Sequence, residues 1–186
     1  MSKKILFIKG SCRKDSITNR LWTDAVKSID DVSVTVFDTF SENFAFCNGC
    51  NYCEKNGKCV HGDLDGFFSD FENADVVVFA SPVYNGSFSA PLKALIDRFQ
   101  VYYTAFYEKG KVQPVKKHRK CILLAAAGRN GSAAFDSMVK NLKCSFTILN
   151  AELTGAVLCA NTDSVPNYEN ALEELKCILK RSLSDE

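Results

Sequence analysis

The amino-acid sequence predicts a doubly wound α/β domain, in which a parallel sheet is covered by helices on both faces. Short apolar runs alternate with helical patterns along the chain, as a β-α unit repeated five times. The length of 186 residues fits one domain over residues 1–186, with no internal repeat and no linker. Hydrophobic residues make up 46% of the chain and charged residues 24%, which argues against disordered and fibrous classes.

The first half of the chain contains three predicted strands. Residues 5–8 form an apolar run between lysines, which indicates a strand buried on both faces. Residues 16–29 have apolar side chains four apart, as on one face of a helix. Valines at 32, 34 and 36 alternate with polar residues, as in a second strand. Residues 75–80 are the clearest buried strand, which ends where Pro82 removes a backbone donor.

The second half continues the alternation. A helix begins at Ser89, with Pro91 tolerated in its first turn and an apolar face that extends to Phe99. The elements predicted after it are a strand at 121–127, a helix at 135–149, a strand at 152–159 and a helix at 168–183.

One connection is too long for this rhythm. Residues 39–64 separate the second strand from its helix by about 25 residues, whereas roughly 2 to 6 are typical. Four of the nine cysteines lie in this insertion. Long connections of this kind are often functional, so the insertion is a candidate site.

The cysteines of the insertion follow the pattern C-x2-C-x2-C-x5-C. Three thiols two residues apart, with a fourth a few residues later, can surround one four-iron four-sulfur cluster. A tetrahedral zinc site, in which His61 replaces one thiol, and a thiol loop without metal are the alternatives. The candidate metal ligands are Cys47, Cys50, Cys53 and Cys59.

The other five cysteines are expected to be structural. Those at 121, 144, 159 and 177 fall on strands or apolar helix faces, which predicts small core residues. Cys12 lies in a loop and is also assigned no reactivity. The start of the chain lacks the apolar stretch of a secretion signal, and no run is long enough for a membrane span, so we expect a reducing cytoplasmic location.

The loop after the first strand favours a phosphate. It offers hydroxyls at Ser11, Ser16 and Thr18, the forked cation of Arg13, and the start of a helix. Its position beyond the carboxyl end of a strand is where ligands bind in open α/β sheets. The alternative is that Ser16 or Asp15 only caps the helix and Arg13 is solvated. The loop has neither the G-x-G-x-x-G nor the G-x-x-x-x-G-K-[ST] spacing, which disfavours a dinucleotide site and a nucleotide hydrolase.

Two further loops follow the third and fourth predicted strands. Residues 82–86 place a tyrosine and an asparagine between a proline and a glycine, so the backbone is stiff and a flat ligand can approach it. Residues 126–131 form a second loop of small residues. The three loops should meet at one crevice.

Three motifs together resemble a known family. They are Gly-Ser-x-Arg-x-x-Ser-x-Thr after the first strand, Ser-Pro-Val-Tyr after the third, and Ala-Pro-Leu-Lys-x-x-Ile-Asp-Arg on the next helix. This combination is similar to the NAD(P)H-dependent FMN reductases of flavodoxin-like fold. With the cysteine insertion, the chain more closely resembles their iron-sulfur flavoprotein branch.

The resemblance implies a five-stranded sheet of order 2-1-3-4-5, bound FMN and an oligomer, either a dimer or a tetramer. It implies that the phosphate is surrounded by Ser11, Arg13, Ser16, Thr18 and Asn19. It implies that the isoalloxazine ring lies along Pro82, Val83, Tyr84, Asn85, Gly86, Ala127 and Gly128. Because the second strand neighbours the first in this order, we expect the cysteine insertion on the phosphate side of the FMN, where it serves the flavin of a neighbouring chain.

The leading hypothesis is an FMN-dependent oxidoreductase that couples FMN to a four-iron four-sulfur cluster. A cluster-free NAD(P)H-dependent FMN or quinone reductase and a non-enzymatic flavin and thiol redox sensor are the alternatives. The expected redox partners are NAD(P)H, a quinone or a ferredoxin-like carrier. No residue is assigned as a catalytic acid or base.

The charge distribution gives no reason to expect other partners. The net charge of +1 does not favour nucleic-acid binding, and no membrane partner is expected. Residues 109–120 carry six lysines or arginines and no acid, which most often marks a solvated loop. A contact with the phosphate of NADPH or with an acidic carrier is the alternative. The aromatic residues between 99 and 107 are expected either in the core or at a subunit contact.

Overall fold

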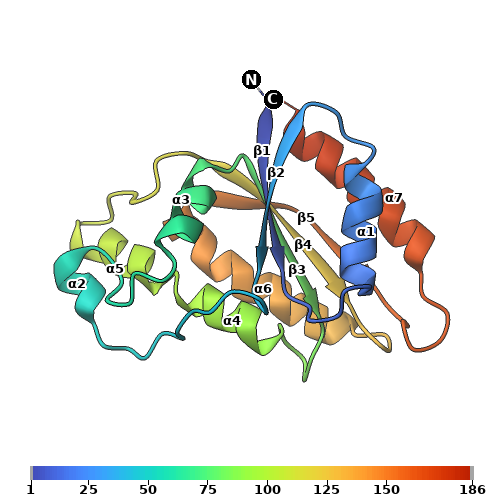
Figure 1. The fold of residues 1–186 in the computed structure, drawn as a ribbon, viewed down its shortest axis with the longest axis horizontal. Helices are drawn as coiled ribbons and strands as arrows, with labels where there is room; N and C mark the ends of the chain where they lie inside the picture. Colours follow the sequence, from blue (N-terminus) through green and yellow to red (C-terminus); the bar gives the residue numbers. More distant parts are fainter. Residues whose placement is uncertain (1, 185–186) are drawn as a thin grey trace.

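Five parallel strands form the centre of the protein, in the order β2-β1-β3-β4-β5 (Figure 1). This computed structural model describes residues 2–184. The strands are β1 (Lys3–Lys9), β2 (Val32–Asp38), β3 (Val76–Pro82), β4 (Arg119–Ala126) and β5 (Ala151–Cys159). The predicted fold class and the strand order implied by the family resemblance are both confirmed.

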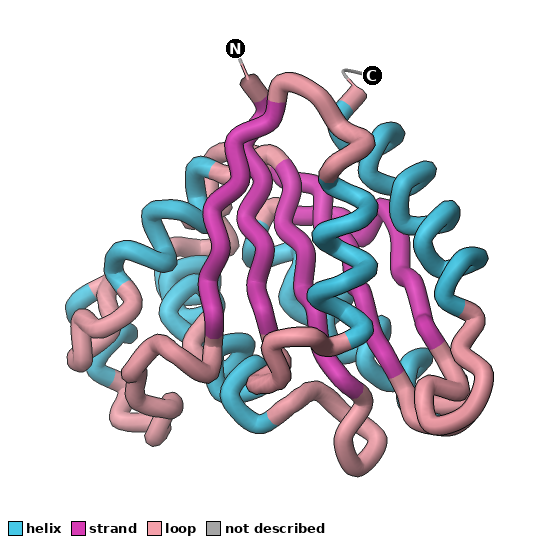
Figure 2. Tube along the Cα trace, turned by 45° about the vertical axis from the view of Figure 1, so that its right-hand side comes forward, coloured by secondary structure: helices cyan, strands magenta, loops and turns pink. Residues whose placement is uncertain are grey.

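Helices cover both faces of the sheet (Figures 1 and 2). One face carries α1 (Ile17–Val26) and α7 (Tyr168–Leu183). The opposite face carries α3 (Asp65–Asn73), α4 (Ala90–Asp97), α5 (Gln100–Glu108) and α6 (Ser132–Leu149). The remaining helix, α2 (Tyr52–Asn56), lies within the long connection after β2.

Alternation along the strands divides the apolar core into two layers. In β1, Ile5 and Phe7 pack under α1 and α7, whereas Leu6 and Ile8 pack under the helices of the other face. Phe7 stacks on Trp22 of α1 with ring centroids 4.6 Å apart. The central strand β3 is buried from Val76 to Ser81, so its apolar run covers both layers.

The carboxyl ends of all five strands lie at one edge of the sheet, the lower edge in Figure 2. The loops that leave the strands there therefore gather at that edge. Gly10 begins the loop after β1, and its N–H donates to the carbonyl of Ala80 at 2.8 Å. This bond holds the start of the loop against the end of β3.

The sequence pattern did not predict where some of the helices begin and end. The chain was expected to reach a helix after residue 64, and α3 starts at Asp65. The helix that begins near Ser89 ends at Asp97, and a second helix, α5, follows directly. In the other half of the molecule, β5 carries an extra residue, Thr154, opposite the step from Cys121 to Ile122.

No helix in residues 2–184 combines the length and the apolar character that a bilayer crossing requires.

Replacement of Gly10 by alanine should destabilise the fold. A Cβ atom there would lie 2.5 Å from the carbonyl oxygen of Ala80 and 2.9 Å from a methyl carbon of Leu92, so buried backbone would have to move. We expect a loss of about 1–3 kcal/mol in the free energy of unfolding, measured with urea. The matched control is Gly66→Ala in α3, where nothing lies within 4 Å and alanine should be neutral or stabilising by up to about 1 kcal/mol. Equal stability of the two variants would contradict the packing described for Gly10.

Candidate functional site

A cleft of about 340 Å³ opens at the carboxyl edge of the sheet. Its walls come from the loops after β1, β3, β4 and β5. The lining residues are Ser11, Arg13, Asp15, Ser16, Ile17, Thr18, Pro82, Val83, Tyr84, Ala126, Gly128, Thr162 and Asp163.

Side chains of the first loop fix its conformation. The Oγ atom of Ser16 caps α1 by accepting a hydrogen bond from the N–H of Asn19 at 3.2 Å, and lies 3.2 Å from the Thr18 hydroxyl. The Asn19 side-chain amide donates to the carbonyls of Arg13 and Lys14. The Oγ atom of Ser11 accepts from the N–H of Arg13 at 3.3 Å. The loop is therefore ordered by its own residues around the start of the helix.

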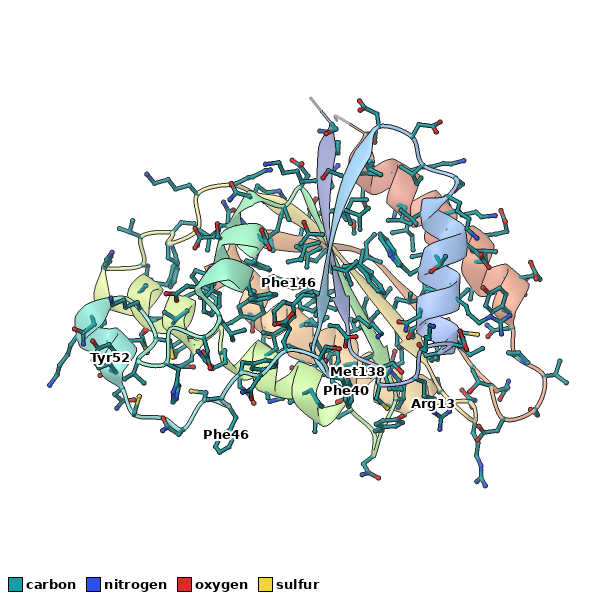
Figure 3. The ribbon with its side chains drawn as sticks, viewed as in Figure 1. Arg13, Phe40, Phe46, Tyr52, Met138 and Phe146 are labelled. Atoms are coloured by element: carbon teal, nitrogen blue, oxygen red, sulfur yellow. The ribbon has the colours of Figure 1, made fainter. Side chains whose placement is uncertain are left out.

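Arg13 takes no part in this support through its side chain. The side chain is exposed and forms no hydrogen bond or ion pair with any residue in the range 2–184 (labelled in Figure 3). The first turn of α1 also leaves backbone N–H groups without acceptors inside the helix. A free guanidinium next to a helix start is an arrangement suited to an anion. The capping role of Ser16 and an anion site are thus compatible, because the cap does not use Arg13.

The second wall is stiff and largely apolar. The N–H of Val83 donates to the carbonyl of Ala126 at 2.8 Å, which fixes the end of β3 to β4. Tyr84 and Ser87 exchange backbone hydrogen bonds at 2.9 Å across a tight turn. Asn85 and Gly86 occupy the turn with φ of 48° and 77°, a conformation that favours these two residue types. The Tyr84 side chain is 44% exposed and is free to contact a flat ligand.

The cleft contains most of the residues that the sequence suggested for FMN. Eight of them line it: Ser11, Arg13, Ser16, Thr18, Pro82, Val83, Tyr84 and Gly128. Four do not line it: Asn19 braces the first loop, Asn85 and Gly86 form the turn, and Ala127 is buried at the start of the loop after β4.

The loop after β5 also contributes to the cleft, which the sequence pattern did not predict. The N–H groups of Asn161, Thr162 and Asp163 donate to the carbonyls of residues 127–129 at 3.0 Å. This pairing brings Thr162 and Asp163 into the cleft. A Cβ atom on Gly128 would lie 2.3 Å from the Asp163 carboxylate, so glycine permits the close approach. The available signal was the position of this loop after a parallel strand, since it must emerge at the same edge.

The four cysteines of the insertion line a second pocket. They share it with Arg98, at the end of α4, and with Gln100 and Val101 of α5. All four thiols are free; Cys50 is exposed and the other three are half-buried. Within residues 2–184, no three cysteine, histidine or acidic side chains converge closely enough to form a metal site. The pocket therefore brings the four predicted ligands together, although their sulfur atoms do not surround a common point. His61 lines the same pocket, so its donors are four thiols, which suit iron, and one imidazole, which the zinc alternative would use.

The cleft and the cysteine pocket lie in different parts of the folded molecule. Figure 3 shows Arg13 of the cleft and Tyr52 of the cysteine segment toward opposite ends of the molecule. The segment turns to the face that carries α4 and α5, and its pocket shares no lining residue with the cleft. That the segment lies on the phosphate side of a bound FMN stays a prediction, since β2 ends beside β1 while its connection turns to the face of α4 and α5.

The prediction that the other cysteines are core residues holds for two of the four. Cys121 and Cys159 are buried, and burial raises the pKa of the Cys121 thiol to about 12 and also raises that of Cys159. Cys144 and Cys177 are exposed on α6 and α7. Both positions lie beside the apolar stripe of a helix, so the sequence pattern predicted burial where the thiols are exposed.

Residues 109–120 are partly engaged in the fold. Lys117 forms an ion pair with Asp75 at 2.9 Å, and Lys120 donates to the carbonyl of Ser184. Arg119 is 1% exposed, lies over the ring of Phe71 and donates to its carbonyl. Three of the six cationic side chains therefore stabilise the fold. Fewer of them are left to bind NADPH or an acidic carrier.

The chain is similar in sequence to known proteins. Residues 3–156 match the family described as NADPH-dependent FMN reductase. An iron-sulfur flavoprotein of Methanocaldococcus jannaschii is 34% identical over 112 residues, which are 59% of this chain and 58% of that protein. An iron-sulfur flavoprotein of Methanosarcina thermophila is 33% identical over 98 residues, 51% of each chain. The chain therefore matches little more than half the length of these relatives.

Solved structures share the fold. An NAD(P)H:quinone oxidoreductase from Methanothermobacter marburgensis superposes with a TM-score of 0.76 at 15% identity, covering 100% of this chain and 98% of that one. An FMN-dependent NADH-azoreductase from Bacillus anthracis, solved in complex with FMN, gives a TM-score of 0.72 at 17% identity, covering 98% of this chain and 100% of that one.

Replacement of Ser16 by alanine should destabilise α1. The variant loses the acceptor for the N–H of Asn19, which should cost about 1 kcal/mol in the free energy of unfolding. Urea unfolding gives the value. The control is Ser137→Ala in the exposed middle of α6, which should be neutral or slightly stabilising. A Ser16 variant as stable as its control would show that the cap contributes nothing.

Proposed function

Because the chain belongs to the NADPH-dependent FMN reductase family, we propose that it is an FMN-dependent oxidoreductase that couples FMN to a four-iron four-sulfur cluster. The observation that supports this most strongly is the presence of two separate pockets in one chain. One pocket pairs a free cation with a helix start, and the other is lined by four free thiols. The similarity to proteins named iron-sulfur flavoproteins points in the same direction.

The cleft residues fit FMN by their chemistry. Arg13, the hydroxyls of Ser11 and Thr18, and the start of α1 would bind the phosphate. Pro82, Val83 and Tyr84 would hold the isoalloxazine ring against the end of β3. When bound, FMN supplies exchange of either one or two electrons with a donor and an acceptor. The protein contributes a rigid cradle, because both walls are held by their own hydrogen bonds.

The thiol pocket fits an iron-sulfur cluster by its donor set. Cys47, Cys50, Cys53 and Cys59 would be the ligands, after a local movement that brings the sulfur atoms together. A cluster supplies exchange of single electrons. Arg98 is buried beside these thiols, where its positive charge would offset the negative charge of thiolate ligands.

We further propose a cytoplasmic homo-oligomer, either a dimer or a tetramer, that uses NAD(P)H as donor and a quinone or a ferredoxin-like carrier as partner. The separation of the two pockets supports electron exchange between copies of the chain. Tyr103 and Tyr107 of α5 offer an apolar contact surface, since they are 45% and 48% exposed and their ring centroids are 4.6 Å apart. The remaining aromatic residues of this stretch pack into or against the core: Phe99, Tyr102 and Phe106. Nine free thiols are consistent with a reducing compartment.

A cluster-free flavin or quinone reductase is the second candidate. The observation that favours it is the lack of convergence among the thiols within residues 2–184. In this case the cleft would function alone, and the cysteine segment would be structural or bind zinc.

Metal analysis of the protein purified without air separates the two candidates. The proposed function predicts about four irons and four sulfides per chain, and a visible absorbance that dithionite bleaches in addition to the flavin bands. Cys59→Ser should lose most of the iron, whereas the control Cys144→Ser, an exposed thiol outside the segment, should keep it. Zinc in place of iron, or equal iron in the two variants, would favour the cluster-free candidate.

Replacement of Arg13 by alanine tests the phosphate end of the cleft. Loss of a charge-assisted hydrogen bond should weaken FMN binding by about 10- to 100-fold, with Arg13→Lys between the variant and the wild type. Quenching of FMN fluorescence by the flavin-free protein measures the affinity. The urea midpoint should not change, because the Arg13 side chain forms no hydrogen bond or ion pair with any other described residue. The control Arg129→Ala, on a neighbouring rim loop, should bind FMN as the wild type does; equal affinities in both alanine variants would exclude Arg13 from the phosphate site.

A further inference from the structure

A buried arginine lies under the cysteine segment. Arg98 is the C-cap residue that follows α4, and only 2% of its surface is exposed. It lines the same pocket as the four thiols. Its Nε atom is buried and has no hydrogen-bond partner within the described chain. A buried guanidinium with unused donor capacity is costly, so its position calls for a physical reason.

The guanidinium joins the two ends of the cysteine segment. One terminal nitrogen donates to the carbonyl of Ala45 at 2.5 Å, and the other donates to the Asp63 carboxylate at 2.6 Å. The Asp63 carboxylate also accepts from the N–H of Ala45 at 2.7 Å. Ala45 precedes Cys47 and Asp63 follows Cys59, so these three residues, which we call the Arg98 clamp, close residues 46–62 into a loop.

The clamp also places positive charge beside one thiol. Arg98 and Cys59 line the same pocket, and the guanidinium forms an ion pair with the Asp63 carboxylate at 2.6 Å. The same pairing lowers the pKa of Asp63 against the opposing effect of its burial. Both partners are therefore charged at neutral pH. The negative side of the pair is directed toward the loop ends, and the cation borders the thiols.

A cation at this place has an electrostatic consequence for any cluster held by the four thiols. Each electron that such a cluster accepts adds one negative charge close to the guanidinium. A nearby fixed positive charge favours the more negative state, and second-shell groups of this kind tune metal sites.

We propose that Arg98 is a positioning residue for the cysteine pocket: the Arg98 clamp closes residues 46–62 so that the four thiols face one space, and the guanidinium beside Cys59 stabilises the reduced form of the cluster. This inference rests on the proposed function for its second half. Its first half concerns the polypeptide alone and holds whether or not a cluster is bound.

The two charged partners give opposite predictions for the reduction potential. Arg98→Gln removes the cation and leaves the Asp63 carboxylate, so the cluster should become harder to reduce. Asp63→Asn removes the carboxylate and leaves the cation, so the cluster should become easier to reduce. Both substitutions break the clamp, and a role in structure alone would shift both potentials in the same direction or in neither. Arg98→Lys keeps the positive charge but loses the pair of terminal nitrogens that donate to Ala45 and Asp63. The reduction potential of its cluster should therefore stay near that of the wild type.

The experiment is an anaerobic redox titration of the holoprotein, followed by the electron paramagnetic resonance of the cluster. At the wild-type midpoint, we expect the ratio of reduced to oxidised cluster to fall about tenfold in Arg98→Gln, which corresponds to about 59 mV for one electron. It should rise in Asp63→Asn. The control is Lys93→Gln, which breaks an exposed ion pair with Asp97 on the same helix and should leave the potential unchanged. Shifts of the same sign in the Arg98 and Asp63 variants would overturn the electrostatic role.

A second measurement tests the clamp without the cluster. After removal of iron by a chelator, the alkylation rates of the four thiols are compared with that of Cys144 in the same chain. Arg98→Gln and Asp63→Asn should both increase the rates for the segment at least fivefold, whereas the rate for Cys144 should not change. Unchanged rates for the segment would overturn the positioning role.

The two arms separate this inference from the proposed function. A wild-type protein without iron would refute the proposed cluster and the electrostatic role with it, and the alkylation rates would still decide on the clamp. If Arg98→Gln does not fold, as judged by its circular dichroism and FMN binding, Asp63→Asn and Arg98→Lys decide both arms.

Discussion

Every strand of the sheet is parallel to its neighbours, and this one constraint positions both pockets. Parallel pairing sends all five carboxyl ends to one edge, so each loop that follows a strand begins there. The connections after β1 and β2 then cover opposite faces, with α1 on one side and α3 on the other. The phosphate-type loop and the cysteine segment consequently start side by side and end far apart. Helix α4 links them: its first residues follow the cleft wall at Pro82–Ser89, and Arg98 at its end reaches the thiols, about 12 Å away at 1.5 Å per residue.

Local pattern was sufficient to predict most of the fold. Buried strands such as β3 have continuous apolar runs, and α7 has an apolar stripe so regular that both of its ends were predicted. Features that depend on tertiary packing were not predicted. The apolar pattern predicted the helix face that extends to Phe99, but not the break at this residue between α4 and α5. Cys144 and Cys177 lie at the border of apolar stripes, where the sequence does not determine exposure.

In the two pockets, too, features set by local sequence were predicted and features set by long-range contacts were not. The loop around Arg13 was predictable because its hydrogen bonds join residues close in sequence. Thr162 and Asp163 were missed because they enter the cleft through backbone bonds to a loop more than thirty residues earlier. Arg98 was visible only as the end of a family motif, and its contacts with Ala45 and Asp63 span 53 and 35 positions. Spacing of the cysteines predicted a shared pocket, and the structure shows the residue that closes it.

We propose that one chain binds a flavin in the cleft and iron among the four thiols, at opposite ends of α4. X-ray diffraction from crystals of protein purified without air, recorded above and below the iron absorption edge, tests this proposal. We expect an anomalous iron peak bordered by Cys47, Cys50, Cys53 and Cys59 and by Arg98, together with flavin density between Arg13 and Tyr84. An empty or zinc-containing cysteine pocket, or iron elsewhere in the chain, would contradict it.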